Sequence, residues 1–127
     1  MKFDRLIKHA KLIVPLIDER SKSFHVSYLL KRNQIVSVGI NKAWHSHPIG
    51  AAHQTRFSCL HAEAHAIIKS RWRVDRLDKL TLVNLRFKRD LSVGLAKPCI
   101  PCQNMLRSFG ITNIYYTLEG GDFAQME

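Results

Sequence analysis

The stretch CLHAEAHAII, residues 59–68, is the part of the sequence that decides the fold and its chemistry. Its small and apolar residues predict a helix over about 59–72, yet His61, Glu63 and His65 interrupt the apolar run. Ionisable side chains on a buried helix face are unfavourable unless a partner satisfies them. We therefore expect part of this helix to bind a ligand.

A second informative stretch is KPCIPCQNML, residues 97–106. It places Cys99 and Cys102 at the predicted start of a helix over 101–109, where Pro101 is a favourable first residue. Two thiolates at this spacing can bind one ion, and the field of a helix N-terminus favours their negative charge. A thioredoxin-like redox pair is the alternative, but such a pair is expected after the first strand, not near the C-terminus.

The histidine and the two cysteines together predict a zinc site. Tetrahedral zinc needs four ligands, and the sequence has no second Cys-x-x-Cys pair, so His61 is the best candidate for the third ligand. Three protein ligands leave one position open, as in catalytic zinc sites. Zinc at such a position lowers the pKa of a water molecule, and Glu63 is a candidate proton shuttle. A metalloprotease motif does not fit, because Glu63 follows His61 by two residues rather than one.

The remaining sequence predicts one α/β domain over 1–127. Apolar residues at helical spacing predict a helix over 3–17, which Pro15 kinks or ends early. Segments rich in strand formers predict four strands, at 23–31, 34–40, 80–87 and 111–117. Their alternation with helices predicts a three-layer fold, with a mixed central sheet of four to five strands flanked by helices. Residues from 119 onward are predicted to be a polar tail.

Composition limits the function classes. The chain has 20 Lys and Arg against 10 Asp and Glu, a formal net charge of +10, which attracts phosphate groups on nucleotides or nucleic acid. An odd cysteine count of three argues against a secreted disulfide framework. Charges also break up the N-terminal segment too often for a signal peptide or a membrane span. We expect a cytoplasmic protein that does not bind membranes.

His61-Ala62-Glu63 followed by Pro98-Cys99-Ile100-Pro101-Cys102 resembles the signature of the zinc-dependent cytidine and deoxycytidylate deaminase superfamily. The likeness covers nearly the whole chain and is strongest to the small deoxycytidylate-type deaminases of phages and bacteria. It implies one catalytic Zn²⁺ per chain, held by His61, Cys99 and Cys102, with Glu63 moving protons. Because only ten residues follow Thr117, the resemblance also implies a shortened core.

The resemblance further implies how a substrate binds. Asn41, at the end of the second strand, is similar to the family's sugar-contacting asparagine, and the backbone around Ala62 would hold the pyrimidine. The loop over 42–58 would face the sugar or phosphate, with His47 among its candidate contacts. Tyr116 is the aromatic residue expected to line the base pocket. The loop's charges suit an anion: Lys42, His45, His47, His53 and Arg56.

The expected activity is hydrolytic deamination of a cytosine nucleotide, with dCMP converted to dUMP, in a homo-oligomer. One alternative is a deaminase acting on cytosine in single-stranded DNA or RNA, which the basic charge would suit. Another is a non-catalytic zinc-binding protein, which would have no use for Glu63. The sequence leaves open the phosphate state and sugar of the substrate, any allosteric effector, and the roles of His65 and of the pair His45 and His47.

Overall fold

The computed structural model describes residues 3–17, 21, 23–43, 59–71 and 76–126. Two short 3-10 turns, Val14–Leu16 and Leu77–Lys79, accompany the helices and strands. In chain order the elements are α1 (Asp4–Ile13), β1 (Phe24–Lys31), β2 (Gln34–Ile40), β3 (Lys42–Ala43), β4 (Cys59–Leu60), α3 (Ala62–Ser70), β5 (Thr81–Phe87), β6 (Val93–Gly94), α4 (Ile100–Ser108), β7 (Asn113–Thr117) and β8 (Phe123–Gln125).

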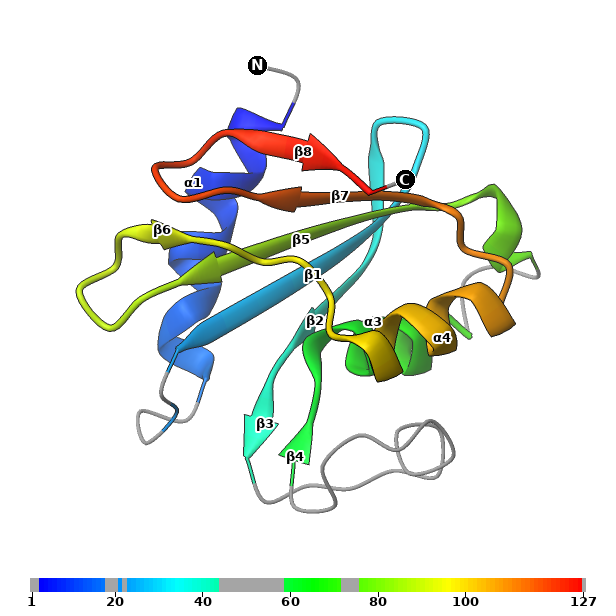
Figure 1. Cartoon of the computed structure of the whole chain (residues 1–127), viewed down its shortest axis with the longest axis horizontal. Coiled ribbons are helices and arrows are strands. Elements are labelled where there is room, and N and C mark those ends of the chain that lie inside the picture. The colour runs from blue at the N-terminus through cyan, green and yellow to red at the C-terminus, as the bar shows by residue number, and fades with distance from the viewer. Residues whose placement is uncertain (1–2, 18–20, 22, 44–58, 72–75, 127) are drawn as a thin grey trace.

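A mixed six-stranded sheet forms the middle layer of the described fold (Figure 1). Its strand order is β2-β1-β5-β7-β8, and β6 pairs with β5. The pair β5 and β7 is parallel, because the chain crosses over through α4 between them, and the other pairs are antiparallel. Strands β3 and β4 form a separate two-stranded ribbon beside the start of α3.

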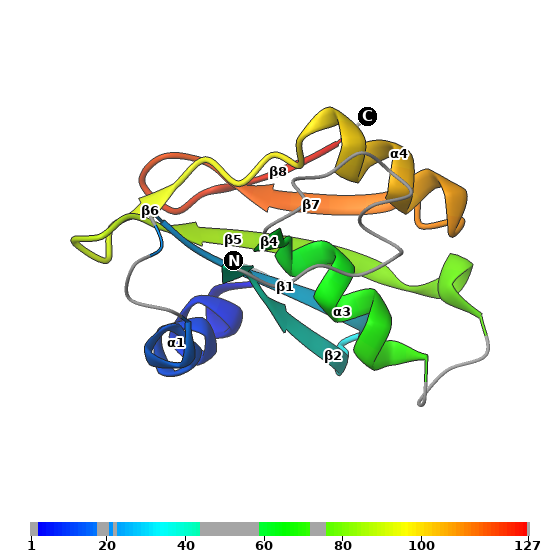
Figure 2. The same ribbon diagram turned by 90° about the horizontal axis from the view of Figure 1, so that it is seen from below.

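Each face of the sheet carries its own apolar core. Helix α1 packs on one face, and α3 and α4 pack on the other, as Figures 1 and 2 show together. Leu6 and Ala10 of α1 are fully buried against residues such as Tyr28 and Phe87. The opposite core joins α3 and α4 to the other face through Leu29, Ala66, Ile67, Leu82, Met105 and Leu106. The alternating side-chain directions of the strands supply one set of residues to each core.

Helix α3 lies very close to β2 at Gly39. A β-carbon at this residue would lie 2.2 Å from the carbonyl oxygen of Ala62 and 2.4 Å from the backbone nitrogen of Ala66. Only glycine therefore permits this helix position. Two side-chain bonds hold the same contact: Ser37 Oγ donates to the Ala66 carbonyl at 2.7 Å, and the Ile40 amide donates to His65 Nδ1 at 3.0 Å. His65 thus bonds to the β2 backbone.

The predicted α/β class is confirmed, and so are the four main strands, whose ends differ by two residues at most. Pro15 ends α1 in a 3-10 turn instead of kinking a longer helix. The second helix begins at Ala62, later than predicted, because Cys59–Leu60 pairs with Lys42–Ala43 as a strand. The polar tail after 119 was predicted wrongly.

The chain after Thr117 turns back and forms a sixth strand. Gly120 and Gly121 both have positive φ, of 90° and 105°, which permits the tight turn. Strand β8 then pairs with β7 in antiparallel register, with Phe123 opposite Thr117. Phe123 packs edge-to-face on Phe3, with ring centroids 5.3 Å apart. The sheet therefore has more than the predicted four to five strands, because the residues after Thr117 supply β8.

Candidate active site

The predicted zinc ligands lie together at the starts of two helices. His61 is the N-cap of α3 and Cys99 is the N-cap of α4. His61 Nδ1 lies 3.1 Å from Cys102 Sγ and 3.9 Å from Cys99 Sγ, and the three ligand atoms are within 4.8 Å of one another. Tetrahedral zinc at ordinary bond lengths requires its ligand atoms to be about 3.6–3.8 Å apart. The donor set and its spacing therefore fit one zinc ion.

The charge state of the two thiols also suits a metal. Hydrogen bonds from Cys102 and His61 lower the pKa of Cys99 to about 4. The Cys99 thiolate and burial raise the pKa of Cys102, and the nearby carboxylate of Glu63 adds to the rise. The two cysteines thus share one proton. A divalent cation between them replaces that proton, so metal affinity should depend on pH.

Glu63 lies in the first turn of α3, close to the cysteines. Its side chain is buried, and burial raises the pKa of its carboxyl group, while its own backbone N–H and Asn84 oppose the rise. A raised pKa is the direction in which carboxyl groups are tuned for general acid–base chemistry.

A chain of buried polar side chains continues from Glu63 into the sheet. Asn84 Nδ2 donates to Glu63 Oε2 at 3.1 Å and to the Ala96 carbonyl at 3.2 Å. Ser27 Oγ donates to Asn84 Oδ1. Ser27 and Asn84 are directly opposite on β1 and β5, on the face that carries α3. The sequence prediction missed both residues, although an asparagine inside the apolar strand TLVNLRF is unusual and was an available signal.

A second pair that the sequence prediction missed is His25 and Arg86, which are opposite each other on β1 and β5. Burial, with the positive charge of Arg86, lowers the pKa of His25 to about 4, and His61 contributes in the same direction. His25 is therefore neutral at neutral pH. Its Nε2 bonds to Ser23 Oγ at 3.0 Å.

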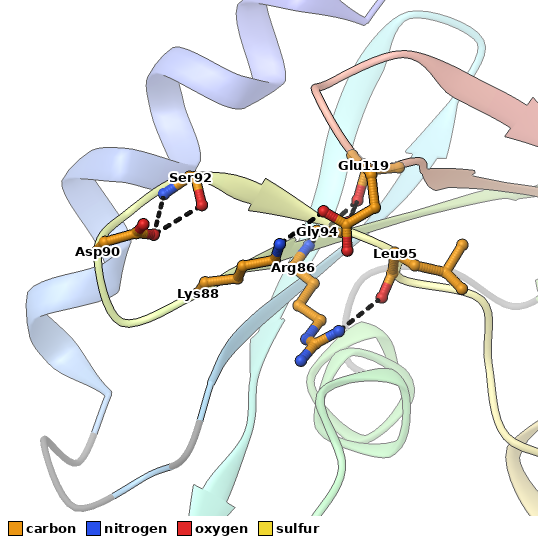
Figure 3. A network of polar contacts seen from close by, with 8 residues as sticks. Arg86, Lys88, Asp90, Ser92, Gly94, Leu95 and Glu119 are labelled. Carbon is orange, nitrogen blue, oxygen red and sulfur yellow. Dashed lines mark hydrogen bonds and ion pairs between the residues drawn. The ribbon is translucent and has the colours of Figure 1, made fainter.

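The segment before Cys99 is held by contacts to the sheet and to α4. The Ala96 amide donates to the Thr117 carbonyl at 2.9 Å, and Gln103 Nε2 donates to the Pro98 carbonyl at 2.9 Å. Figure 3 shows the hairpin that precedes this segment, in which Arg86 Nη1 donates to the Leu95 carbonyl at 3.4 Å. In the same hairpin, Lys88 forms a 2.7 Å ion pair with Glu119, and Asp90 accepts bonds from the amide and hydroxyl of Ser92. The bonds made by the carbonyl of Leu95, the amide of Ala96 and the carbonyl of Pro98 hold the segment that leads to Cys99.

The four predicted substrate-contacting residues differ in their placement. Asn41 follows β2, and its amide group already bonds to the His25 amide, the Ser21 hydroxyl and the Ser23 carbonyl. Ala62 is buried at the start of α3. Tyr116 lies opposite Asn84 on the face that carries α3 and α4, whereas Tyr115 packs on Phe3. His47 lies outside the described residues. The contacts of all four with a substrate remain predictions.

This sheet, with a His, Cys and Cys metal site at two helix starts and a buried glutamate beside it, defines a zinc-dependent deaminase. The chain belongs to the family described as "Cytidine and deoxycytidylate deaminase zinc-binding region", whose sequence model matches residues 4–118. The superfamily resemblance and the zinc cofactor predicted from the sequence are thereby confirmed.

Solved structures share the fold at low sequence identity. A cytidine deaminase from Burkholderia pseudomallei is 17% identical, with a TM-score of 0.68, over 100% of this chain and 93% of that one. A cytidine deaminase from Mycobacterium leprae is 16% identical, with a TM-score of 0.63, over 98% and 93%. A dCMP deaminase from the cyanophage S-TIM5, in complex with dCMP and dUMP, is 22% identical, with a TM-score of 0.59, over 91% and 80%.

No curated protein matches the chain by sequence. Among the helices in the described residues, none combines the length and apolar character that crossing a membrane requires.

Proposed function

We propose that this chain converts the cytosine of a free nucleotide, dCMP, to uracil, giving dUMP and ammonia. The reaction consumes one water molecule, forms a C–O bond at the amino-bearing carbon of the base and breaks the C–N bond there. Bound zinc would supply the activation of water at neutral pH. The observation that carries the proposal is the buried carboxyl group of Glu63, held beside the three ligands His61, Cys99 and Cys102.

Glu63 takes a proton from the attacking water and passes one to the leaving amino group. Both transfers need a group that changes protonation state near neutral pH, and burial tunes the carboxyl group of Glu63 in that direction. A non-catalytic zinc protein would gain nothing from a buried carboxyl group beside its ligands. The alternative of a structural zinc site is therefore the weakest of those considered.

The phosphate on the substrate is supported by the net charge of +10. It is also supported by the cyanophage dCMP deaminase, which shares this fold and was solved with dCMP and dUMP. The unphosphorylated nucleoside is the second candidate. It is favoured by the higher TM-scores to the two cytidine deaminases, 0.68 and 0.63 against 0.59. Cytosine in single-stranded nucleic acid is the third candidate, suited by the same charge.

A single assay separates these candidates. Zinc-loaded protein is incubated with cytidine, deoxycytidine, CMP, dCMP and a cytosine-containing single-stranded oligonucleotide, and the products are measured by mass spectrometry. Preference for dCMP in kcat/KM supports the proposal. Equal use of deoxycytidine would show that no phosphate contact contributes. Turnover of the oligonucleotide alone would overturn the proposal and make the chain a nucleic-acid-modifying enzyme.

A further inference from the structure

We propose that Asn84 is a positioning residue for the proton shuttle, with Ser27 fixing the direction of its amide group. The inference rests on the proposed function, because it assigns a role toward Glu63 in that reaction. All three side chains are buried, with exposed fractions of 0% for Ser27, 3% for Asn84 and 5% for Glu63. A hydrogen bond between such groups is shielded from competing water and restricts each to one arrangement.

The partners of Asn84 determine which way its amide group faces. The Ala96 carbonyl can only accept a hydrogen bond, so the atom of Asn84 beside it must be Nδ2. The second N–H of the same nitrogen is then available for Glu63 Oε2 at 3.1 Å. The oxygen of the amide faces Ser27, whose hydroxyl donates to it. A flipped amide would place oxygen against oxygen at Ala96 and lose the bond to Glu63.

This arrangement makes the two oxygens of Glu63 unequal. Oε2, and not Oε1, accepts the hydrogen bond from Asn84. Asn84 therefore restricts the side-chain rotamer of Glu63 and the direction in which its carboxyl group faces. It does so without itself contacting the reacting atoms.

Asn84 also links the two halves of the site. Its second bond goes to the carbonyl of Ala96, three residues before Cys99, whereas Glu63 lies two residues after His61. The amide thus sets the distance between the carboxyl group on α3 and the segment that leads into α4. A displaced shuttle lowers the rate of proton transfer more than it weakens substrate binding, because the bond is not made to the substrate.

The test compares two identical substitutions in buried serines. Ser27→Ala removes the hydroxyl that orients Asn84, and Ser37→Ala removes a buried hydroxyl that bonds to the backbone of the same helix at Ala66. Asn84→Ala removes the positioning group itself. Zinc content, Tm, kcat and KM are measured for each. The ¹³Cδ resonance of the Glu63 carboxyl group is also recorded in the zinc-loaded protein.

We expect Asn84→Ala to lower kcat at least about tenfold, with KM within about twofold and one zinc retained. Ser27→Ala should lower kcat by a smaller factor, while Ser37→Ala lowers Tm but leaves kcat unchanged. The Glu63 resonance should shift in the first two variants and not in the third. Unchanged kcat in both Asn84→Ala and Ser27→Ala, or a loss of kcat in Ser37→Ala that matches theirs, would overturn the inference.

The outcomes distinguish this inference from the proposed function. If the wild-type protein holds its full zinc but turns over no cytosine compound, the proposed function is refuted. The Glu63 resonance then still tests whether Asn84 contacts Glu63. An active wild type whose resonance and kcat are both insensitive to Asn84→Ala refutes the positioning role alone. If Asn84→Ala does not fold, Ser27→Ala and its control decide the question in the same way.

Discussion

His61 Nδ1 lies 3.1 Å from Cys102 Sγ, although the two residues are 41 positions apart in the chain. The start of α3 and the start of α4 meet there, with Cys99 completing the group of ligand atoms. The contact crosses the α3 and α4 layer, which covers one face of the sheet. A metal ion held by these residues would therefore join the two helices as well as supply chemistry.

Replacing a cysteine ligand should remove the metal. Cys99→Ala and Cys102→Ala leave two ligands, too few for a stable site, so we expect zinc to fall well below one ion per chain and Tm to decrease. Metal content by mass spectrometry and thermal unfolding check this. Chelation of zinc from the wild type should lower Tm similarly and have little effect on either variant. Full zinc stoichiometry in either variant would show that the ligand assignment is wrong.

Removing the carboxyl group should separate catalysis from folding. In Glu63→Ala we expect zinc to remain bound and the circular dichroism spectrum to be unchanged, because Glu63 is not a ligand. Turnover should decrease by about 10²–10⁴-fold or more, the usual contribution of a positioned acid–base group. Substantial remaining activity, measured at equal zinc content, would mean that another group moves the proton.

His25 should make the protein less stable in acid. Histidine binds its proton near pH 6.5 in an unfolded chain, but the folded pKa of His25 is lowered to about 4, mainly by burial. Between these values the unfolded state takes up a proton that the folded state excludes, so stability is lost as pH falls from about 6.5 towards 4. The loss at pH 4 should be about 3 kcal/mol.

The acid effect of His25 is measured as a difference between proteins. Urea unfolding is measured at several pH values for the wild type and for His25→Gln. The difference between their unfolding free energies cancels the contributions of zinc release and of other groups. We expect the two curves of unfolding free energy to run parallel above pH 7. Below pH 6 the wild type should lose stability faster. Parallel curves down to pH 4 would contradict the lowered pKa.

The close contact at Gly39 gives a prediction about packing. In Gly39→Ala the new methyl group would lie within 2.4 Å of backbone atoms of α3, so the helix must move and carry His61 and Glu63 with it. We expect a loss of about 1–3 kcal/mol in unfolding free energy and a lower kcat. Gly94→Ala is the matched control, because its nearest neighbour is a flexible lysine carbon at 3.4 Å. Equal stability of the two variants would contradict the predicted clash.

The sequence by itself predicted the metal ligands and the proton shuttle, and it located the main strands. His61 with Glu63, and Cys99 with Cys102, each stand within a few residues of one another, so both motifs are visible locally, and the resemblance to the deaminase signature joined them. Strands β1, β2, β5 and β7 can also be predicted locally. Each is a short run of strand-forming residues bounded by turn residues, which a window of a few residues reveals.

The tertiary structure decided the remaining features, because they depend on contacts between segments far apart in the chain. Ser27 and Asn84 are 57 residues apart, and in the sequence each is an ordinary residue of a strand. Only the β1–β5 register places them opposite each other. Strand β8 is only three residues long, and its hydrogen bonds come from the edge of β7. The later start of α3 at Ala62 likewise depends on the pairing of β4 with β3. Local propensity is weak in such short segments, so the partner supplied by the fold determines their structure.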